Sequence, residues 1–198
     1  MQLIIISYRQ KIELVCSNGR VLPDAVVRGR KNPLHHAFSA RFRRARRDSG
    51  LTLVDLAARA SLAGGSVLLY LETGTRAPRL DTVEKLAYAL GLSPAFLAYG
   101  LDGEPTLPDD KLRALGVAAR LRTTRIEQDL SVLAVATAAG VSHTAVGNIE
   151  RGTMPGLDTT EALAIALGVS PGWLGYGLGP RELPGRRRAS ESLAPSPG

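Results

Sequence analysis

The 198-residue chain has little of what supports catalysis, secretion or membrane insertion. It holds a single cysteine, Cys16, so an internal disulfide is impossible and a reducing compartment is expected. The apolar run at residues 3–6 is too short for a signal sequence or a membrane span. No metal-ligand spacing, phosphate loop, nucleophile elbow or carboxylate pair is recognisable. We therefore expect no enzyme, no cofactor and no membrane contact, and a cytoplasmic location.

Aromatic residues are also scarce, at 5% of the chain, whereas Ala, Leu and Gly are abundant, which favours small helical units with thin cores. The formal net charge is +7, which suits a polyanionic partner. The charge is distributed unevenly along the chain. Residues 38–103 carry nine basic and six acidic side chains (net +3), and residues 114–178 carry four and five (net −1).

The stretch from Ser131 to Glu150, SVLAVATAAGVSHTAVGNIE, predicts two short helices joined by a tight turn. Ser131 and Ser142 are typical N-cap residues, because a serine hydroxyl accepts a hydrogen bond from an unpaired N–H of the first turn. Gly140 lies where the chain must leave the first helix, a position that favours the left-handed conformation. This pattern predicts a helix-turn-helix motif, whose second helix can enter the major groove of DNA.

An internal repeat organises the rest of the chain. LDTVEKLAYALGLSPAFLAYGL, from Leu80, aligns with LDTTEALAIALGVSPGWLGYGL, from Leu157, at an offset of 77 (157 − 80), and 15 of 22 positions are identical. Three upstream arginines repeat at an offset of 79, namely Arg41, Arg43 and Arg46 with Arg120, Arg122 and Arg125. The first copy therefore has two extra residues, one within residues 63–71, inside or just before its second motif helix, and one in the following loop.

Three segments lie outside the repeats. Residues 1–37 contain two strand-like runs, LIIIS and KIELVC, and an Asn-Gly turn signal at Asn18-Gly19, so we interpret them as an extension that is a candidate β-hairpin. Two strands are marginally stable alone, so this extension packs on a neighbour, pairs in a dimer or is disordered. Residues 104–113 are polar and contain prolines, which predicts a linker. Residues 179–198 lack apolar content, which predicts a disordered tail.

The run GVSHTAVGNIERG, with an Arg-Leu-Arg helix before it and an LxxALGVS helix after it, resembles the Cro/C1-type (XRE) helix-turn-helix domain of phage repressors and bacterial regulators. The resemblance implies an all-α fold of two tandem five-helix, lambda-repressor-like domains, residues 38–103 and 114–178. The second copy is the better match. The family also implies structural ion pairs between the first helix and the end of the recognition helix, here Arg46 with Glu72 and Arg125 with Glu150.

The resemblance also implies positions that contact DNA. In the second copy the base-reading positions correspond to His143, Thr144 and Asn148, and an Asn can bind adenine bidentately. Their first-copy equivalents, Gly65, Ser66 and Tyr70, have little polar reach, so we interpret the first recognition helix as degenerate. Candidate contacts to the DNA backbone are Arg41, Arg43, Arg44, Arg47, Arg120, Arg122 and Arg151.

Both copies lack the family's Gln after the cap of the second helix, where Leu53 and Val132 stand instead. Our leading hypothesis is a bacterial or phage-like transcriptional regulator that binds double-stranded DNA, the first domain supplying electrostatic grip and the second reading sequence. The alternative is a protein-interaction or antitoxin-like module that kept the scaffold and lost DNA reading. A homodimer or another protein could bind through the first domain or the N-terminal extension.

Overall fold

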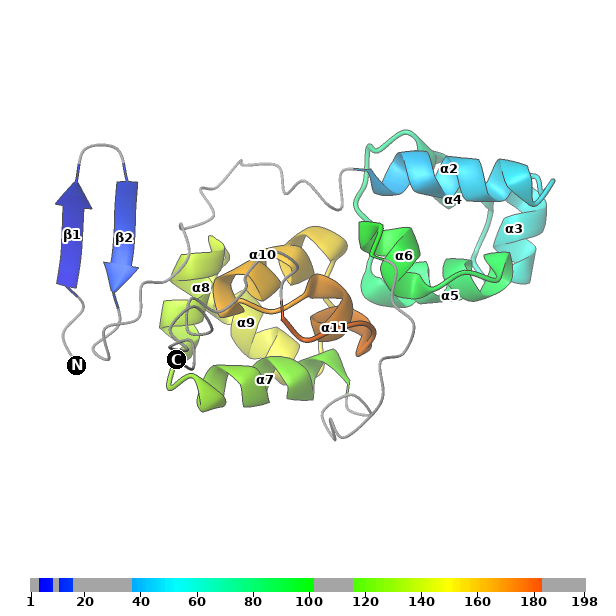
Figure 1. Ribbon diagram of the computed structural model, residues 1–198. Coiled ribbons are helices and arrows are strands. Elements are labelled where there is room, and N and C mark those ends of the chain that lie inside the picture. Colours follow the sequence, from blue (N-terminus) through cyan, green and yellow to red (C-terminus); the bar gives the residue numbers. More distant parts are fainter. Residues whose placement is uncertain (1–3, 9–10, 16–36, 102–115, 183–198) are drawn as a thin grey trace, which may run out of the picture.

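The computed structural model describes residues 4–8, 11–15, 37–101 and 116–182 (Figure 1). The two N-terminal runs form an antiparallel pair, β1 (Ile4–Tyr8) and β2 (Lys11–Val15), in which Tyr8 lies opposite Lys11. The strands therefore connect between residues 8 and 11, and the Asn-Gly signal at residues 18–19 lies outside the described residues. The expected linker, residues 104–113, lies outside them as well.

Five helices form the first module: α2 (Phe38–Asp48), α3 (Leu53–Arg59), α4 (Gly65–Glu72), α5 (Leu80–Leu90) and α6 (Pro94–Tyr99). Thr52 and Asp55 form a capping box that opens α3, because the Thr52 hydroxyl accepts from the Asp55 N–H at 3.1 Å and the Asp55 carboxylate accepts from the Thr52 N–H at 3.3 Å. Phe42, Leu56 and Leu86 are fully buried and hold these helices around one core.

Five helices also form the second module: α7 (Val117–Glu127), α8 (Val132–Ala139), α9 (His143–Glu150), α10 (Leu157–Leu167) and α11 (Pro171–Tyr176). Ser131 and Ser142 cap α8 and α9 as predicted, and Gly140 ends α8 in the left-handed conformation with φ 65°. The chain turns through 117° between α8 and α9, which is the geometry of a helix-turn-helix. No single helix among the described residues is long and apolar enough to cross a membrane.

The two modules match helix by helix, with small shifts in register. The offset between equivalent helix starts falls from 79 (α3 and α8) to 78 (α4 and α9) and then to 77 (α5 and α10). The two extra residues of the first copy therefore lie before α4 and in the loop after it. The turn before α4 includes Ser61 in a left-handed conformation with φ 53°, which costs energy for a residue with a side chain.

The modules meet in a junction with pseudo-twofold symmetry, formed by α6 and α11 and by the chain entering α5 and α10 (Figure 1). The Leu80 N–H donates to the Pro155 carbonyl at 3.1 Å, and the Leu157 N–H donates to the Pro78 carbonyl at the same distance. Two tyrosine hydroxyls repeat this reciprocity: Tyr99 donates to the Leu157 carbonyl at 3.2 Å and Tyr176 to the Leu80 carbonyl at 3.5 Å. Each bond in one direction thus has its equivalent in the other.

Small residues let the two short helices approach closely at the centre of this junction. A Cβ atom placed on Gly172 would lie 3.1 Å from the Ala95 Cβ across the junction, and one placed on Gly175 would lie 3.2 Å from a Leu80 methyl group. Ala95, Leu80 and Leu157 are almost completely buried. The interface is therefore packed as tightly as a protein interior, and the repeated segments that resemble each other most are the ones that form it.

One predicted boundary is wrong. The expected disordered tail begins at Gly179, but residues 179–182 pack on the second module. The Ser170 N–H donates to the Arg181 carbonyl at 2.7 Å, and Val169 forms an antiparallel bridge with Glu182. This contact was not predictable from composition, because an aromatic ring and an acidic side chain of the module hold the Arg181 side chain.

Candidate nucleic-acid interface

A bidentate ion pair fixes the recognition helix of each module, as the family resemblance implies. Arg125 on α7 binds both carboxylate oxygens of Glu150 on α9, at 2.7 and 3.0 Å, and Arg46 on α2 binds those of Glu72 on α4 at 2.6 and 3.4 Å. The Glu150 and Glu72 side chains are only 11% and 7% exposed. The hydrogen bond to Glu150 raises the pKa of Arg125. These pairs hold the first helix to the end of the recognition helix.

The outer face of α9 carries the residues expected to read bases. His143 and Thr144 are exposed at its N-terminal end and Asn148 is partly exposed, whereas Val146 and Ile149 on the opposite face are buried in the core. The helix therefore presents its polar positions outward, as a base-reading helix must.

Sequence reasoning treated Asn148 and Arg151 separately, but their side chains are joined. Arg151 Nη2 donates to Asn148 Oδ1 at 2.5 Å. The Arg151 guanidinium also lies beside Gly147, where a Cβ atom would meet it at 3.4 Å. Because Gly147 has no side chain, Arg151 can lie along the helix and orient the Asn148 amide. The spacing of three residues, from α9 to its C-cap residue Arg151, was the available signal for this contact.

The first recognition helix differs from α9 in its packing. A Cβ atom on Gly65 would lie 3.2 Å from the Leu53 carbonyl carbon, so the N-terminal end of α4 is pressed against the backbone of α3. Gly65 therefore contributes to helix packing rather than to a polar reading surface. The exposed side chains of α4 include Ser66 but are mainly apolar, with Val67 40%, Leu69 49% and Tyr70 53% exposed.

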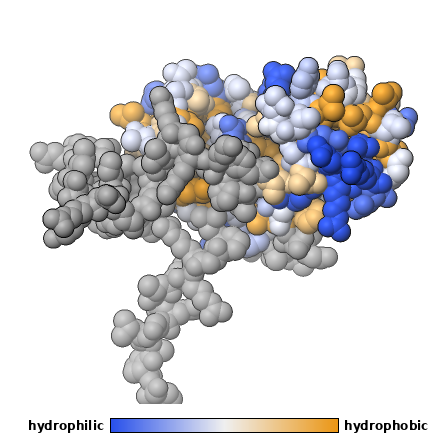
Figure 2. All heavy atoms as spheres, turned by 90° about the horizontal axis from the view of Figure 1, so that it is seen from above, coloured by the Kyte–Doolittle hydropathy of each residue, from blue (hydrophilic) through white to orange (hydrophobic). Residues whose placement is uncertain are grey.

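Exposed arginines gather on α2 of the first module. Arg43, Arg44 and Arg47 are exposed, and Arg43 Nη2 donates to the Glu72 carbonyl at 2.9 Å, which places it at the C-terminal end of α4. In Figure 1, α2 runs along the upper side of the first module. Figure 2, which shows the molecule from above, has a continuous hydrophilic patch on part of this module. Of the candidate backbone contacts in the second module, Arg122 and Arg151 are exposed.

One of the predicted backbone contacts is wrong, and a second, Arg41, is partly buried and bound to carbonyl groups of its own module. Arg120 is only 3% exposed, and its guanidinium donates to the Leu174 and Gly175 carbonyls at 2.9 and 2.8 Å. Arg41, its equivalent, is partly buried and donates to the Leu97 and Ala98 carbonyls. The two arginines bind the unpaired carbonyls at the ends of α11 and α6, where a cation also complements the helix dipole. Burial lowers the pKa of Arg41, and the charge of Glu161 on the other module partly offsets this.

Comparison with known families agrees with this arrangement. Residues 121–174 match a family model described as Helix-turn-helix, and residues 37–104 match one described as Helix-turn-helix domain. No curated protein and no solved structure matches the chain. The two matches fall on the two modules, so each module contributes its own helix-turn-helix.

Proposed function

We propose, from the two tandem helix-turn-helix domains of the XRE type that this chain carries, that it is a sequence-specific transcriptional regulator of the Cro/C1 type. In this proposal one chain binds one DNA duplex with both modules, as an intramolecular counterpart of a repressor dimer. The observation that carries the proposal is the reciprocal junction, in which Leu80 and Leu157 exchange equivalent hydrogen bonds.

The junction matters because a helix-turn-helix dimer reads two half-sites about one helical turn apart, at a spacing fixed by its twofold axis. Here the axis lies inside a single chain, between α6 and α11. The buried contacts around Ala95 and Gly172 give this axis a fixed position. A single chain would therefore cover the length of DNA that a repressor dimer covers.

The two modules would contribute differently to binding. The exposed arginines of α2 suit phosphates, whose neutralisation supplies most non-specific affinity. The polar face of α9 suits base edges, because Asn148 can pair with adenine and Thr144 can contact a thymine methyl group. The first module would thus grip one half-site and the second would read the other.

A second function is favoured by the surface of α4. Val67, Leu69 and Tyr70 are exposed where a base-reading helix would carry polar side chains, and Val54 on α3 is 69% exposed. Exposed apolar side chains on neighbouring helices are typical of protein contacts. In this alternative the scaffold is an interaction or antitoxin-like module, and α4 binds a protein.

Selection of duplexes from a randomised library with the intact chain tests the proposal. We expect enrichment of one information-rich half-site of a few base pairs, flanked one turn away by a protected but sequence-tolerant region. The affinity for the selected duplex should fall steeply with salt, by about 10³-fold or more between 50 and 200 mM if six or more phosphates are contacted. Failure to enrich any duplex at low salt would favour the interaction module instead.

A further inference from the structure

Each module has a groove between its first helix and its last two helices, and in the second module residues 179–182 fill it. The Arg181 guanidinium lies 4.8 Å from the centre of the Trp173 ring on α11. Arg181 also forms an ion pair with Glu127 on α7 and donates to the Thr124 hydroxyl at 3.3 Å. An aromatic ring and a carboxylate thus hold one arginine from both sides, by cation–π attraction and charge.

The backbone of the same segment is also held. The Ser170 N–H, before the start of α11, donates to the Arg181 carbonyl at 2.7 Å, and Val169 pairs with Glu182 in an antiparallel bridge. The groove therefore accepts an extended chain. The Ser170 N–H positions the backbone of that chain, and Trp173 and Glu127 bind its arginine side chain.

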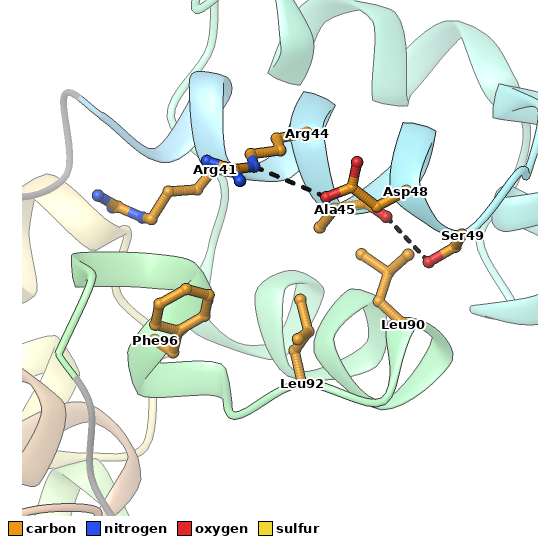
Figure 3. Close-up of a pocket in the computed structure, with 8 residues that line it drawn as sticks. All are labelled: Arg41, Arg44, Ala45, Asp48, Ser49, Leu90, Leu92 and Phe96. Carbon is orange, nitrogen blue, oxygen red and sulfur yellow. Dashed lines mark hydrogen bonds and ion pairs between the residues drawn. The ribbon is translucent and has the colours of Figure 1, made fainter.

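No described residue fills the equivalent groove of the first module. It is a cavity of about 490 Å³ lined by Arg41, Arg44, Ala45, Asp48, Ser49, Leu90, Leu92 and Phe96 (Figure 3). Phe96 stands at the position of Trp173, and Asp48 at that of Glu127. No described residue accepts a hydrogen bond from the Ser93 N–H, the equivalent of the Ser170 donor.

The chain that leaves the first module is not suited to this groove. At the offset of 77, the residue equivalent to Arg181 is Glu104 (181 − 77). A glutamate would be repelled by Asp48 and could not form the ion pair that Arg181 forms with Glu127. The groove therefore keeps its aromatic and acidic groups but lacks an arginine supplied by its own continuation.

We propose that the open groove of the first module docks an extended, arginine-bearing segment, and that its occupant is residues 183–188 of this chain, LPGRRR. This segment repeats the pattern of the chain that fills the second groove: LGPR at residues 178–181 and LPGR at residues 183–186 each have a leucine, then Gly and Pro, then arginine. The inference concerns a site separate from the recognition helices and does not depend on DNA binding.

The charges at the groove allow an arginine of the tail to replace Arg44 as the partner of Asp48. Asp48 is 69% exposed and forms an ion pair with Arg44 at 3.7 Å, and the Arg44 side chain is 85% exposed. Such a surface ion pair contributes little, so an incoming arginine can replace Arg44 at Asp48. The second module has Thr123 at the position of Arg44, and there the arginine of the tail takes the carboxylate without competition.

The test uses the full-length chain with Arg186, Arg187 and Arg188 replaced by Ala, so that its own tail cannot compete. A fluorescently labelled peptide of residues 183–190 is titrated in and binding is followed by anisotropy. We expect Asp48→Asn to weaken binding by about tenfold, and Arg44→Thr to tighten it by about threefold. Both changes are on exposed side chains, so loss of folding does not confuse the result. Phe96→Leu, which keeps an apolar side chain, should weaken binding by about threefold.

Two controls test whether residues 183–188 of the chain are the segment that binds the groove. A peptide with all three arginines replaced by Gln should not bind, and the wild-type chain should bind the labelled peptide more weakly than the tail variant because its own tail competes. The proposal is overturned if the peptide does not bind, if Asp48→Asn and Arg44→Thr leave its affinity unchanged, or if wild type and tail variant bind it equally. It is also overturned if a peptide of residues 26–33, VVRGRKNP, displaces the tail peptide and binds more tightly.

Discussion

Leu80 and Leu157 occupy equivalent positions on the two sides of the junction, and each donates its backbone N–H to the carbonyl oxygen of the proline two residues before the other. The two hydrogen bonds are 3.1 Å long in both directions. Such reciprocity is the mark of an isologous interface, which normally joins two copies of one chain. Here it joins two halves of one chain, and it fixes where the two recognition helices lie relative to each other.

Replacement of Asn148 by Ala should relax the choice of base at one position of the selected site. Because a bidentate pair discriminates by about 1–3 kcal/mol, we expect the preference at that position to fall by roughly one order of magnitude or more, with little change in non-specific affinity. Binding to the selected duplex and its single-base variants measures this. Tyr70→Ala at the equivalent position of α4 is the matched control and should leave the preference unchanged. An unaltered preference in Asn148→Ala would remove this residue from the reading surface.

Replacing Arg122 and replacing Arg120, both on α7, should have different effects on DNA binding and stability. Arg122 is exposed, so Arg122→Ala should reduce the slope of log affinity against log salt by about one and leave sequence preference intact. Arg120 is buried and binds two helix-end carbonyls, so Arg120→Ala should instead lower the free energy of unfolding by about 1–3 kcal/mol. Salt titrations and urea unfolding separate the two effects. A change of salt slope without loss of stability in Arg120→Ala would contradict the structural role.

Removing one partner of the ion pair between Arg125 and Glu150 should lower the free energy of unfolding. Arg125→Met leaves the mostly buried Glu150 carboxylate unpaired, and we expect a loss of about 3 kcal/mol in the free energy of unfolding. The double change Arg125→Met with Glu150→Leu should recover much of this loss, because no buried charge remains. Fluorescence of Trp173, the single tryptophan, reports unfolding in urea, because its side chain is only 2% exposed in the folded module. Equal losses in the single and double variants would argue against a buried unpaired charge.

Asp129 and Gly50 occupy equivalent left-handed positions at the ends of α7 and α2, with φ 53° and 67°. A side chain is disfavoured there, so Asp129→Gly should stabilise the second module by up to about 1 kcal/mol. Gly50→Asp should destabilise the first module by about 1 kcal/mol because of its left-handed backbone, although no atom lies within 4 Å of the added Cβ. Thermal unfolding followed by circular dichroism measures both. Opposite signs in the two variants are the expected result, and equal signs would contradict it.

The junction should lose stability at alkaline pH. Burial, with a smaller effect of Glu161, raises the pKa of Tyr99 well above its ordinary value, and burial likewise raises that of Tyr176. The folded state therefore holds these protons more tightly than the unfolded chain. Their contribution is complete below the unfolded pKa of about 10 and is lost as pH rises towards the folded pKa.

Urea unfolding at about pH 9 and about pH 10.5 tests this dependence, since these values bracket the unfolded pKa of tyrosine. Tyr99→Phe with Tyr176→Phe should flatten the pH dependence, at the cost of two hydrogen bonds. Tyr88→Phe is the matched control, because the Tyr88 side chain is 75% exposed and is not buried in the junction. A wild-type slope retained in the double variant would show that other groups cause the alkaline loss.

Much of the local structure was predictable because it depends on neighbours in sequence. Ser131 and Ser142 cap their helices since the caps need only a hydroxyl three residues before an N–H. The ion pairs followed from the family pattern and its spacing. Ser39, near the start of α2, does not cap its helix: its hydroxyl donates to the Leu71 carbonyl at 2.6 Å, a partner that lies 32 residues away and that local sequence does not indicate.

Arginine roles were the hardest to predict. Arg41 and Arg120 cannot be distinguished in the sequence from the exposed arginines beside them, but their side chains bind the C-terminal ends of α6 and α11. Nothing in the local sequence separates a guanidinium that binds phosphate from one that binds backbone carbonyls. The docking of Arg181 was not predicted for the same reason, since a tail that looks disordered by composition packs on Trp173 of the preceding helix, α11, and on Glu127 of α7.

The sequence alone determined that this chain repeats one helical unit, that Ser131 and Ser142 cap the two helices of the second motif, and which recognition helix carries polar or apolar side chains outward. These features depend on residue type, periodicity and spacing, which are local. Only the tertiary structure decided that the two units meet about a pseudo-twofold axis, that Arg41 and Arg120 bind the ends of helices, and that described residues fill one groove but not its twin. Those outcomes depend on which surfaces touch, and contacts between residues far apart in the chain leave no local signature.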